Sequence, residues 1–187
     1  MLSLSGDHRR MSGVLIAVIA ILSLVPIVDQ VTKWAVVNSM ELYESIEIIP
    51  GILNFTYIRN DGAAFGKFDN VRWLFMILST IAIVVIAVLM IKYRKKLDKL
   101  TMISLSLILS GGFSNMIDRT FYGETIFNGT VIDFIDFCAF PKIWNYVFNV
   151  ADSAVVIGTV LLIIAMVISE VKIYKAEKAK KEEKKSD

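Results

Sequence analysis

The stretch FNVADSAVVIGTVLLIIAMVI, residues Phe148 to Ile168, decides the fold because it has the composition of a membrane-spanning helix. A bilayer core about 30 Å thick is crossed by about 20 apolar residues in a helix, and this stretch has about that length. Asp152, near its start, is the exception. A carboxylate among apolar residues is costly unless it has a partner or a function, so the acid itself requires an explanation.

Three further runs of the same kind occur in the chain. Of its 187 residues, 56% are hydrophobic, and they concentrate in four runs rather than spreading as in a soluble core. The runs are approximately Gly13–Val28, Val71–Ile91, Leu100–Ile117 and Val147–Ser169. Because backbone groups in lipid must be bonded within their own segment, the sequence predicts an all-α membrane protein with four transmembrane helices. The first run continues into VDQVTKWAVV rather than a cleavage site, so we interpret it as an uncleaved helix.

Lysine and arginine residues predict how these helices are oriented. They gather before the first run, between the second and third runs, and after the fourth. If four helices alternate, these segments share one side, which the positive-inside rule makes cytoplasmic. We therefore expect both termini in the cytoplasm, with a membrane domain at residues 1–169, a charged cytoplasmic tail at 170–187, and outer segments at 37–70 and 118–146.

The two outer segments carry patterns of their own. Residues 53–58 alternate between the two faces of a strand and are followed by the turn sequence Asn60-Asp61-Gly62, which favours a small β-sheet or hairpin outside the membrane. A plain extracellular loop with a turn is the alternative. In residues 134–146, aromatic side chains recur as they do in the headgroup zone, so we expect a short interfacial helix there.

Histidine and cysteine are too scarce for several kinds of chemistry. Cys138 is the only cysteine and His8 the only histidine, which lies on the expected cytoplasmic side. An intrachain disulfide is excluded, and a triad with a histidine base or a zinc site outside the membrane lacks its usual residues. We expect no metal, no cofactor and no nucleic-acid partner. If the outer side carries out chemistry, carboxylates are the candidates.

Polar residues enter the predicted helices at one depth, toward the outer side. Asp29 and Lys33 are four residues apart and share a helix face, as do Asn149 and Asp152, which are three apart. The remaining polar positions are Asn115, Asp118 and Arg119 in the third run, and Asp133 and Asp136 ahead of the fourth. Each group also has a simpler interpretation, namely a local ion pair, a packing seam, a helix cap or ordinary loop acids. Their common depth favours a site.

Two carboxylates in one site divide acid and base roles between them. At close range both cannot ionise easily, so one stays charged and activates a water molecule while the other keeps its proton for the carbonyl oxygen. Asp133 and Asp152 are the candidate pair. Their spacing in the sequence alone does not show that they meet.

Five stretches together resemble the lipoprotein signal peptidase family, also called signal peptidase II. They are DQVTK (29–33), NDGAAFG (60–66), GGFSNMIDR (111–119), VIDFIDF (131–137) and FNVADS (148–153). The resemblance implies a membrane aspartic endopeptidase that cuts diacylglyceryl-modified prolipoproteins just before the lipidated cysteine. It also implies action as a monomer, surrounded by lipid, in the bacterial cytoplasmic (inner) membrane with the active site at the outer face.

Site residues follow from the resemblance motif by motif. Asp133 and Asp152 would be catalytic. Asn115, Arg119 and Asn149 would line the site and hold the substrate backbone, and Asn60 and Gly62 would lie in an outer sheet that cradles the substrate. Asp29, Lys33 and Asp118 would support the structure around the site.

The chain departs from the family pattern in one place. The stretch TFYGETIFNGT, residues 120–130, is longer than is typical, which leaves open whether Gly123 or Gly129 takes the family's position. Asp136 is a rival acid to Asp133, which we prefer because it holds the first position of the motif. A small ion-coupled transporter and a structural partner subunit are the competing functions, since membrane carboxylates also relay protons or pair helices.

Overall fold

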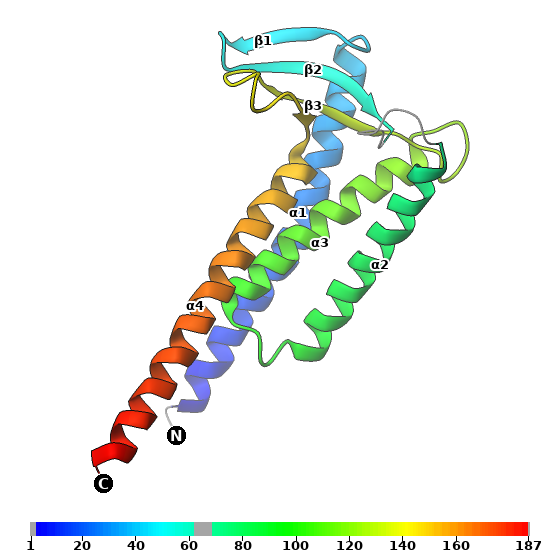
Figure 1. Cartoon of the computed structure of the whole chain (residues 1–187). Helices are drawn as coiled ribbons and strands as arrows, with labels where there is room; N and C mark the ends of the chain where they lie inside the picture. Colours follow the sequence, from blue (N-terminus) through cyan, green and yellow to red (C-terminus); the bar gives the residue numbers. More distant parts are fainter. Residues whose placement is uncertain (1–2, 62–68, 187) are drawn as a thin grey trace.

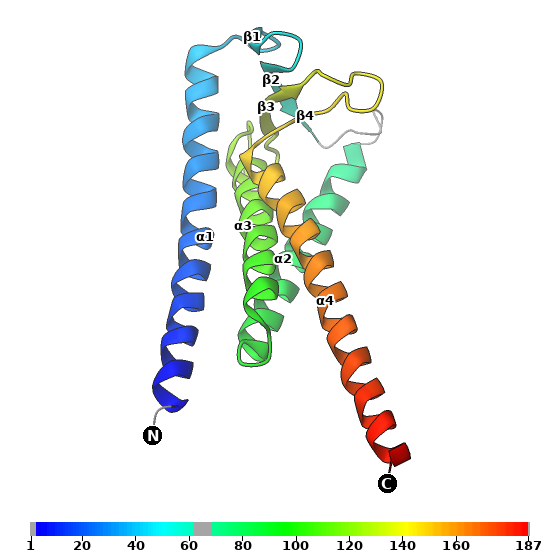
Figure 2. The same cartoon turned by 90° about the vertical axis from the view of Figure 1, so that its left-hand side faces the viewer.

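The computed structural model describes residues 3–61 and 69–186. Its helices are α1 (Ser3–Ser39), α2 (Asp69–Tyr93), α3 (Lys99–Phe121) and α4 (Val150–Ser186). Its strands are β1 (Ser45–Ile49), β2 (Leu53–Asn60), β3 (Val131–Phe137) and β4 (Val147–Phe148). The sheet caps one end of the helix bundle, while both termini and the α2–α3 link lie toward the opposite end (Figures 1 and 2).

Four helices in the described part of the chain are long and apolar enough to cross a membrane, which confirms the predicted runs. The spans are Gly13–Ser39, Met76–Tyr93, Lys99–Phe121 and Val150–Glu182. The first and last extend well beyond their apolar runs. α1 continues through Asp29 and Lys33 because these charges pair with each other inside the bundle. α4 continues into the tail because lysine and glutamate are good helix formers.

α3 is the central helix and packs against each of the other three. Its contact with α4 is close at Gly111, where a side-chain methyl group would overlap the carbonyl oxygen of Ala151 and lie 2.8 Å from Val155 Cγ2. The absence of a side chain at Gly111 therefore allows α4 to approach α3 closely here. Gly112, on the α2 side, has more room, since the same methyl group would lie 3.5 Å from Ile83 Cγ1.

The sheet is antiparallel, with strand order β1-β2-β3-β4. The predicted strand at residues 53–58 is present within β2, which forms a hairpin with the preceding β1 through a turn at residues 50–52. The predicted turn Asn60-Asp61-Gly62 extends beyond the described residues. The third strand, β3, comes from VIDFIDF, which the sequence analysis did not assign to a strand. β2 pairs with β3 so that Asn60 lies opposite Val131 and Ile58 opposite Asp133, with a bulge between Phe55 and Ile58. This pairing joins residues more than 70 positions apart and brings Asn60 to the edge of the site.

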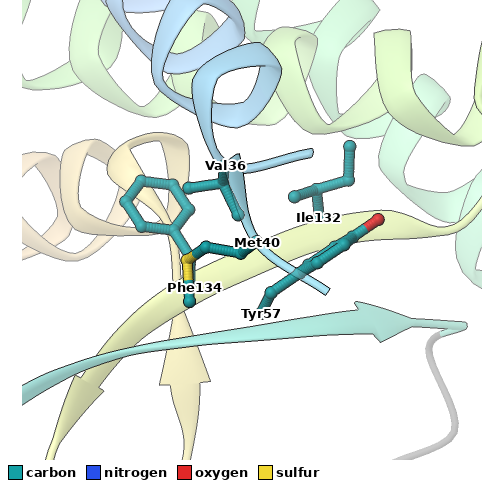
Figure 3. Close-up of a cluster of buried hydrophobic side chains, with 5 residues drawn as sticks. All are labelled: Val36, Met40, Tyr57, Ile132 and Phe134. Carbon is teal, nitrogen blue, oxygen red and sulfur yellow. The ribbon is translucent and has the colours of Figure 1, made fainter. Parts of the chain in front are cut away.

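A hydrophobic cluster seats the sheet on the end of α1. Val36 comes from the last turn of α1, Met40 directly follows that helix, Tyr57 comes from β2, and Ile132 and Phe134 come from β3 (Figure 3). All five side chains are buried. Since removing such area from water contributes about 25 cal/mol per Å², the cluster holds β3 firmly against the helix bundle.

The expected short interfacial helix is not formed. Residues 138–146 instead contain a tight turn, in which the amides of Ile143 and Trp144 both donate to the carbonyl oxygen of Phe140, at 2.9 and 2.8 Å. The segment is short, and its two ends are fixed by strands β3 and β4 of the same sheet. Pro141 also lacks an N–H for continued helical bonding. These constraints favour a return turn over a helix.

We predict that Gly111→Ala lowers the stability of the α3–α4 contact, whereas Gly112→Ala is tolerated. The first change forces a methyl group onto the Ala151 carbonyl, and overpacking of this kind costs about 1–3 kcal/mol. Thermal unfolding of the two variants in the same detergent would measure the difference. Equal midpoints for both alanine variants would contradict the tight packing at Gly111.

Candidate functional site

A buried lysine lies at the centre of the polar residues. Lys33 Nζ lies 2.7 Å from Asp29 Oδ2 and 2.7 Å from Asp118 Oδ2, and all three side chains are fully buried. It also donates to Asn115 Oδ1 at 3.0 Å. An ammonium group has three N–H donors, so each has an acceptor here. The expected Asp29–Lys33 pair is present, and Asp118 joins the same cluster.

The two aspartates of this cluster also receive bonds from other elements. Asp29 Oδ1 accepts the backbone N–H of Ala151 in α4 at 2.9 Å, and Asp29 Oδ2 accepts the Ser114 hydroxyl at 2.6 Å. Asp118 Oδ2 accepts the N–H of Ile132 in β3 at 3.2 Å. The charge cluster therefore fixes the starts of α4 and of β3, which are the elements that carry the two candidate catalytic acids.

Asn149 caps α4 and connects the two candidate acids. Its Oδ1 accepts the N–H of Asp152 at 2.8 Å, while its own backbone N–H donates to Asp152 Oδ2 at 3.2 Å. This reciprocal pair is a capping box, in which the third helical residue bonds back to the cap. The Asn149 amide Nδ2 donates to Asp133 Oδ1 at 2.6 Å. Asn149 therefore bonds to both carboxyl groups, to that of Asp133 through its side chain and to that of Asp152 through its backbone N–H.

Asn115 links the charge cluster to Asp152. Its Oδ1 accepts from Lys33 and from Asn149 Nδ2, both at 3.0 Å. Because the amide oxygen is occupied by these donors, the nitrogen must point the other way, and Nδ2 donates to Asp152 Oδ1 at 2.7 Å. The orientation of Asn115 is thus set by a fully buried charge.

Asp133 is buried and has an unusual proton affinity. Its Oδ2 accepts from Asn60 Nδ2 at 2.9 Å, and its Oδ1 accepts from Asn149. Burial, and after it the nearby charge of Asp152, raise the pKa of Asp133 from 3.8 to about 7, although both amide bonds oppose the shift. At neutral pH this carboxyl group is therefore poised to hold or release a proton.

The remaining candidate residues, Arg119, Gly62 and Asp136, do not all lie in this hydrogen-bond network. Arg119 is half-buried at the C-terminal end of α3, directly after Asp118. Gly62 lies outside the described residues. Asp136, the rival acid, accepts a bond from Thr56 Oγ1 at 2.9 Å and pairs with Asn54 of β2, whereas Asn149 bonds to Asp133. The structure thus groups Asp133, and not Asp136, with Asp152.

Two contributing residues, Gln30 and Ser114, were missed in the sequence. Gln30 Nε2 donates to Asp118 Oδ1 at 2.7 Å, and the Ser114 hydroxyl bonds to Asp29. Ser114 is four residues before Asp118, so the helical spacing was a usable signal. Gln30 had no such signal beyond its place next to Asp29. Among the described residues, no group of three His, Cys, Asp or Glu side chains is arranged to hold a metal ion.

Together these features define a multi-pass membrane protein with a carboxylate-rich site where the helices meet the sheet. Comparison with known proteins identifies the family. The sequence profile described as Signal peptidase (SPase) II matches residues 19–168, and the chain belongs to that family. It is a protease that cleaves the signal peptides of lipoproteins, so neither a transporter nor a structural subunit is retained as an interpretation.

Solved structures agree with this assignment. One bacterial membrane enzyme, determined by the in meso method at 2.3 Å resolution, is 34% identical with a TM-score of 0.69, over 82% of this chain and 88% of that one. A second, determined by the same method at 1.9 Å, is 35% identical with a TM-score of 0.67, over 80% of this chain and 91% of that one. The likeness therefore extends over most of both chains.

We predict that Lys33→Met strongly destabilises the protein. Removing the ammonium leaves Asp29 and Asp118 buried without their cation, and breaking a buried pair in this way costs about 3–5 kcal/mol. Lys178→Met is the matched control, because Lys178 is exposed and its pair with Glu182 is long, at 3.8 Å. Chemical unfolding in detergent would compare the two, and equal losses of stability would contradict a central role for Lys33.

Proposed function

We propose that this signal peptidase is an aspartic endopeptidase with Asp133 and Asp152 as its catalytic pair. The observation that carries the proposal is the bridge made by Asn149, which bonds to one oxygen of each carboxyl group. Two acids that are bonded to the same residue, one through its side chain and one through its backbone N–H, can act on one water molecule and one peptide bond. The substrate is a prolipoprotein with a diacylglyceryl-modified cysteine, cut on the N-terminal side of that cysteine.

The surroundings of the two acids favour different roles. Asp133, with a pKa raised to about 7, holds the proton. Asp152 accepts N–H bonds at both oxygens, from Asn115 and from the Asn149 backbone, so donors are already in place beside its carboxyl group. Asp152 is therefore assigned as the base that activates water, and Asp133 as the acid.

The reaction then proceeds in two balanced steps. Asp152 takes a proton from water as the oxygen attacks the scissile carbonyl carbon, and Asp133 gives its proton to the carbonyl oxygen. The resulting tetrahedral diol collapses when Asp133 recovers that proton, the C–N bond breaks, and the proton on Asp152 passes to the leaving amine. Both acids return to their starting forms. Their titration belongs to the pair rather than to either residue alone.

Substrate binding is assigned to residues around the pair. Asn60 already touches Asp133 from the sheet, and Arg119 lies at the end of α3, so both are proposed to hold the substrate backbone with Asn115 and Asn149. Gly62, outside the described residues, is proposed for the same function. All catalytic and supporting groups come from a single chain, which supports action as a monomer surrounded by membrane lipid.

The proposed location is the bacterial cytoplasmic (inner) membrane, with the site facing outward. Lysine and arginine are concentrated near the start of α1, between α2 and α3, and in the tail. These segments lie at the end of the molecule away from the sheet (Figure 2). Because positive charge stays in the cytoplasm, both termini are assigned to that side and the sheet to the outside.

Asp133→Asn and Asp152→Asn should each abolish cleavage while the protein remains folded. Removal of an acid or base that acts in the transition state costs about 10²–10⁴-fold in rate. Incubation with a diacylglyceryl-modified precursor, followed by determination of the new N-terminus, measures the reaction. Asp136→Asn is the control and should keep its activity, since Asp136 accepts a bond from Thr56 and is not part of the proposed pair. Full activity in either dyad variant would refute the assignment.

The pH dependence follows from the raised pKa of Asp133. We expect kcat/KM to fall above about pH 7, where Asp133 loses its proton. Stability has the related dependence, because the unfolded acid ionises near its ordinary pKa of 3.8 while the folded one keeps its proton to about 7. The free energy of unfolding should thus decline across this interval and stay level above it. Asp133→Asn should remove the decline, which thermal unfolding at several pH values would test.

A further inference from the structure

The long stretch after α3, residues 121–130, forms a closed loop with an apolar tip. Three large side chains point outward within seven residues, with exposed fractions of 70% for Phe121, 68% for Ile126 and 46% for Phe127. Neighbouring Glu124 and Asn128 are polar and also exposed. The catalytic assignment does not use any of these residues.

The backbone holds this tip in a fixed form. The amide of Phe127 donates to the Thr120 carbonyl at 3.0 Å, and that of Gly129 donates to the Arg119 carbonyl at 2.9 Å. Both Gly123 and Gly129 lie too close to neighbouring backbone for a side chain. Phe127 itself has a φ of 66°, a conformation that is unfavourable for a bulky residue and is usual for glycine or asparagine. The fold thus keeps an aromatic residue exposed at a cost in backbone energy.

The tip is continuous with the lipid-facing surface of the bundle. Phe121 is the last residue of the membrane-spanning helix α3. Phe113, Ile117 and Phe121 are spaced four residues apart, so they form one stripe along that helix. Phe113 is 52% exposed, as expected for a residue facing lipid. The loop therefore extends this apolar stripe to the end of the span, where amphipathic segments settle into the boundary between headgroups and acyl chains.

We propose that Phe121, Ile126 and Phe127 form a lipid-binding tip that inserts into the leaflet on the sheet side of the membrane. Its occupant is bulk membrane lipid. Glu124 and Asn128 would lie among the headgroups, and the tip would hold the end of α3, which carries Asp118 and Arg119, at a constant depth. The proposal rests on the membrane-spanning helices and does not depend on the identity of the catalytic acids.

Fluorine NMR of the full-length protein in lipid nanodiscs without substrate would test this tip. Replacing Phe127 with trifluoromethylphenylalanine keeps the residue type and places the probe at the tip. The same replacement at Phe113 supplies a lipid-facing reference, and at Phe134, which is buried, a shielded one. A nitroxide on the upper part of the acyl chain should broaden the signals at 127 and 113 at least about threefold more than the signal at 134. The reason is that the apolar face of an interfacial segment lies about 5–10 Å inside the boundary between headgroups and acyl chains, close to the nitroxide.

Two results would overturn the proposal. Stronger broadening at 127 by a water-soluble gadolinium chelate than by the lipid nitroxide would place the tip in solvent. Protection of 127 from both agents, together with two chains per nanodisc by mass measurement, would make the tip a contact between copies of this chain instead.

Discussion

The buried ammonium of Lys33 is the interaction on which the rest of the structure depends. It lies between two carboxylates and an amide, with no exposed surface on the charged groups. One positive charge between two negative ones leaves a surplus of negative charge, which low-dielectric surroundings make costly. The surplus negative charge is offset by neutral N–H and O–H groups that donate hydrogen bonds to Asp29 and Asp118. Since those donors belong to α1, α3, α4 and β3, satisfying the charge also assembles these four elements.

Helix capping and site geometry are a single arrangement at the start of α4. An asparagine cap with an acid three residues later is an ordinary way to begin a helix, and it requires no catalytic function. Here the cap amide has a second use, since Asn149 Nδ2 reaches Asp133 while Oδ1 holds the N–H of Asp152. The simple interpretation of Asp152 as a capping acid and the catalytic interpretation are therefore compatible. The same bonds serve both.

What could be predicted from the sequence follows from the range of the interactions involved. The four spans are local, because an apolar run must form its own helix in lipid, and the pairs Asp29–Lys33 and Asn149–Asp152 are one turn apart. Contacts between segments that are distant in the sequence could not be predicted from the local pattern of residues. Nothing local assigns VIDFIDF to a strand, because its pairing with β2 and the bond from Ile132 to Asp118 join distant segments. The turn in residues 138–146 likewise depends on the sheet at both its ends.

The family motifs suggested the roles proposed for the two acids, and the structure adds a reason for the raised pKa of Asp133. β3 carries Asp133 into the bundle between the sheet and α4, where burial disfavours its charge. The side-chain amides of Asn60 and Asn149 are neutral donors. Their bonds to Asp133 only partly offset the hydration that its carboxylate loses on burial. Raising the pKa by burial costs stability at neutral pH, so the strand must be held by other means. The hydrophobic cluster on α1 and the Asp118–Ile132 bond provide that hold. The raised pKa of Asp133 is thus a consequence of where the sheet is fastened.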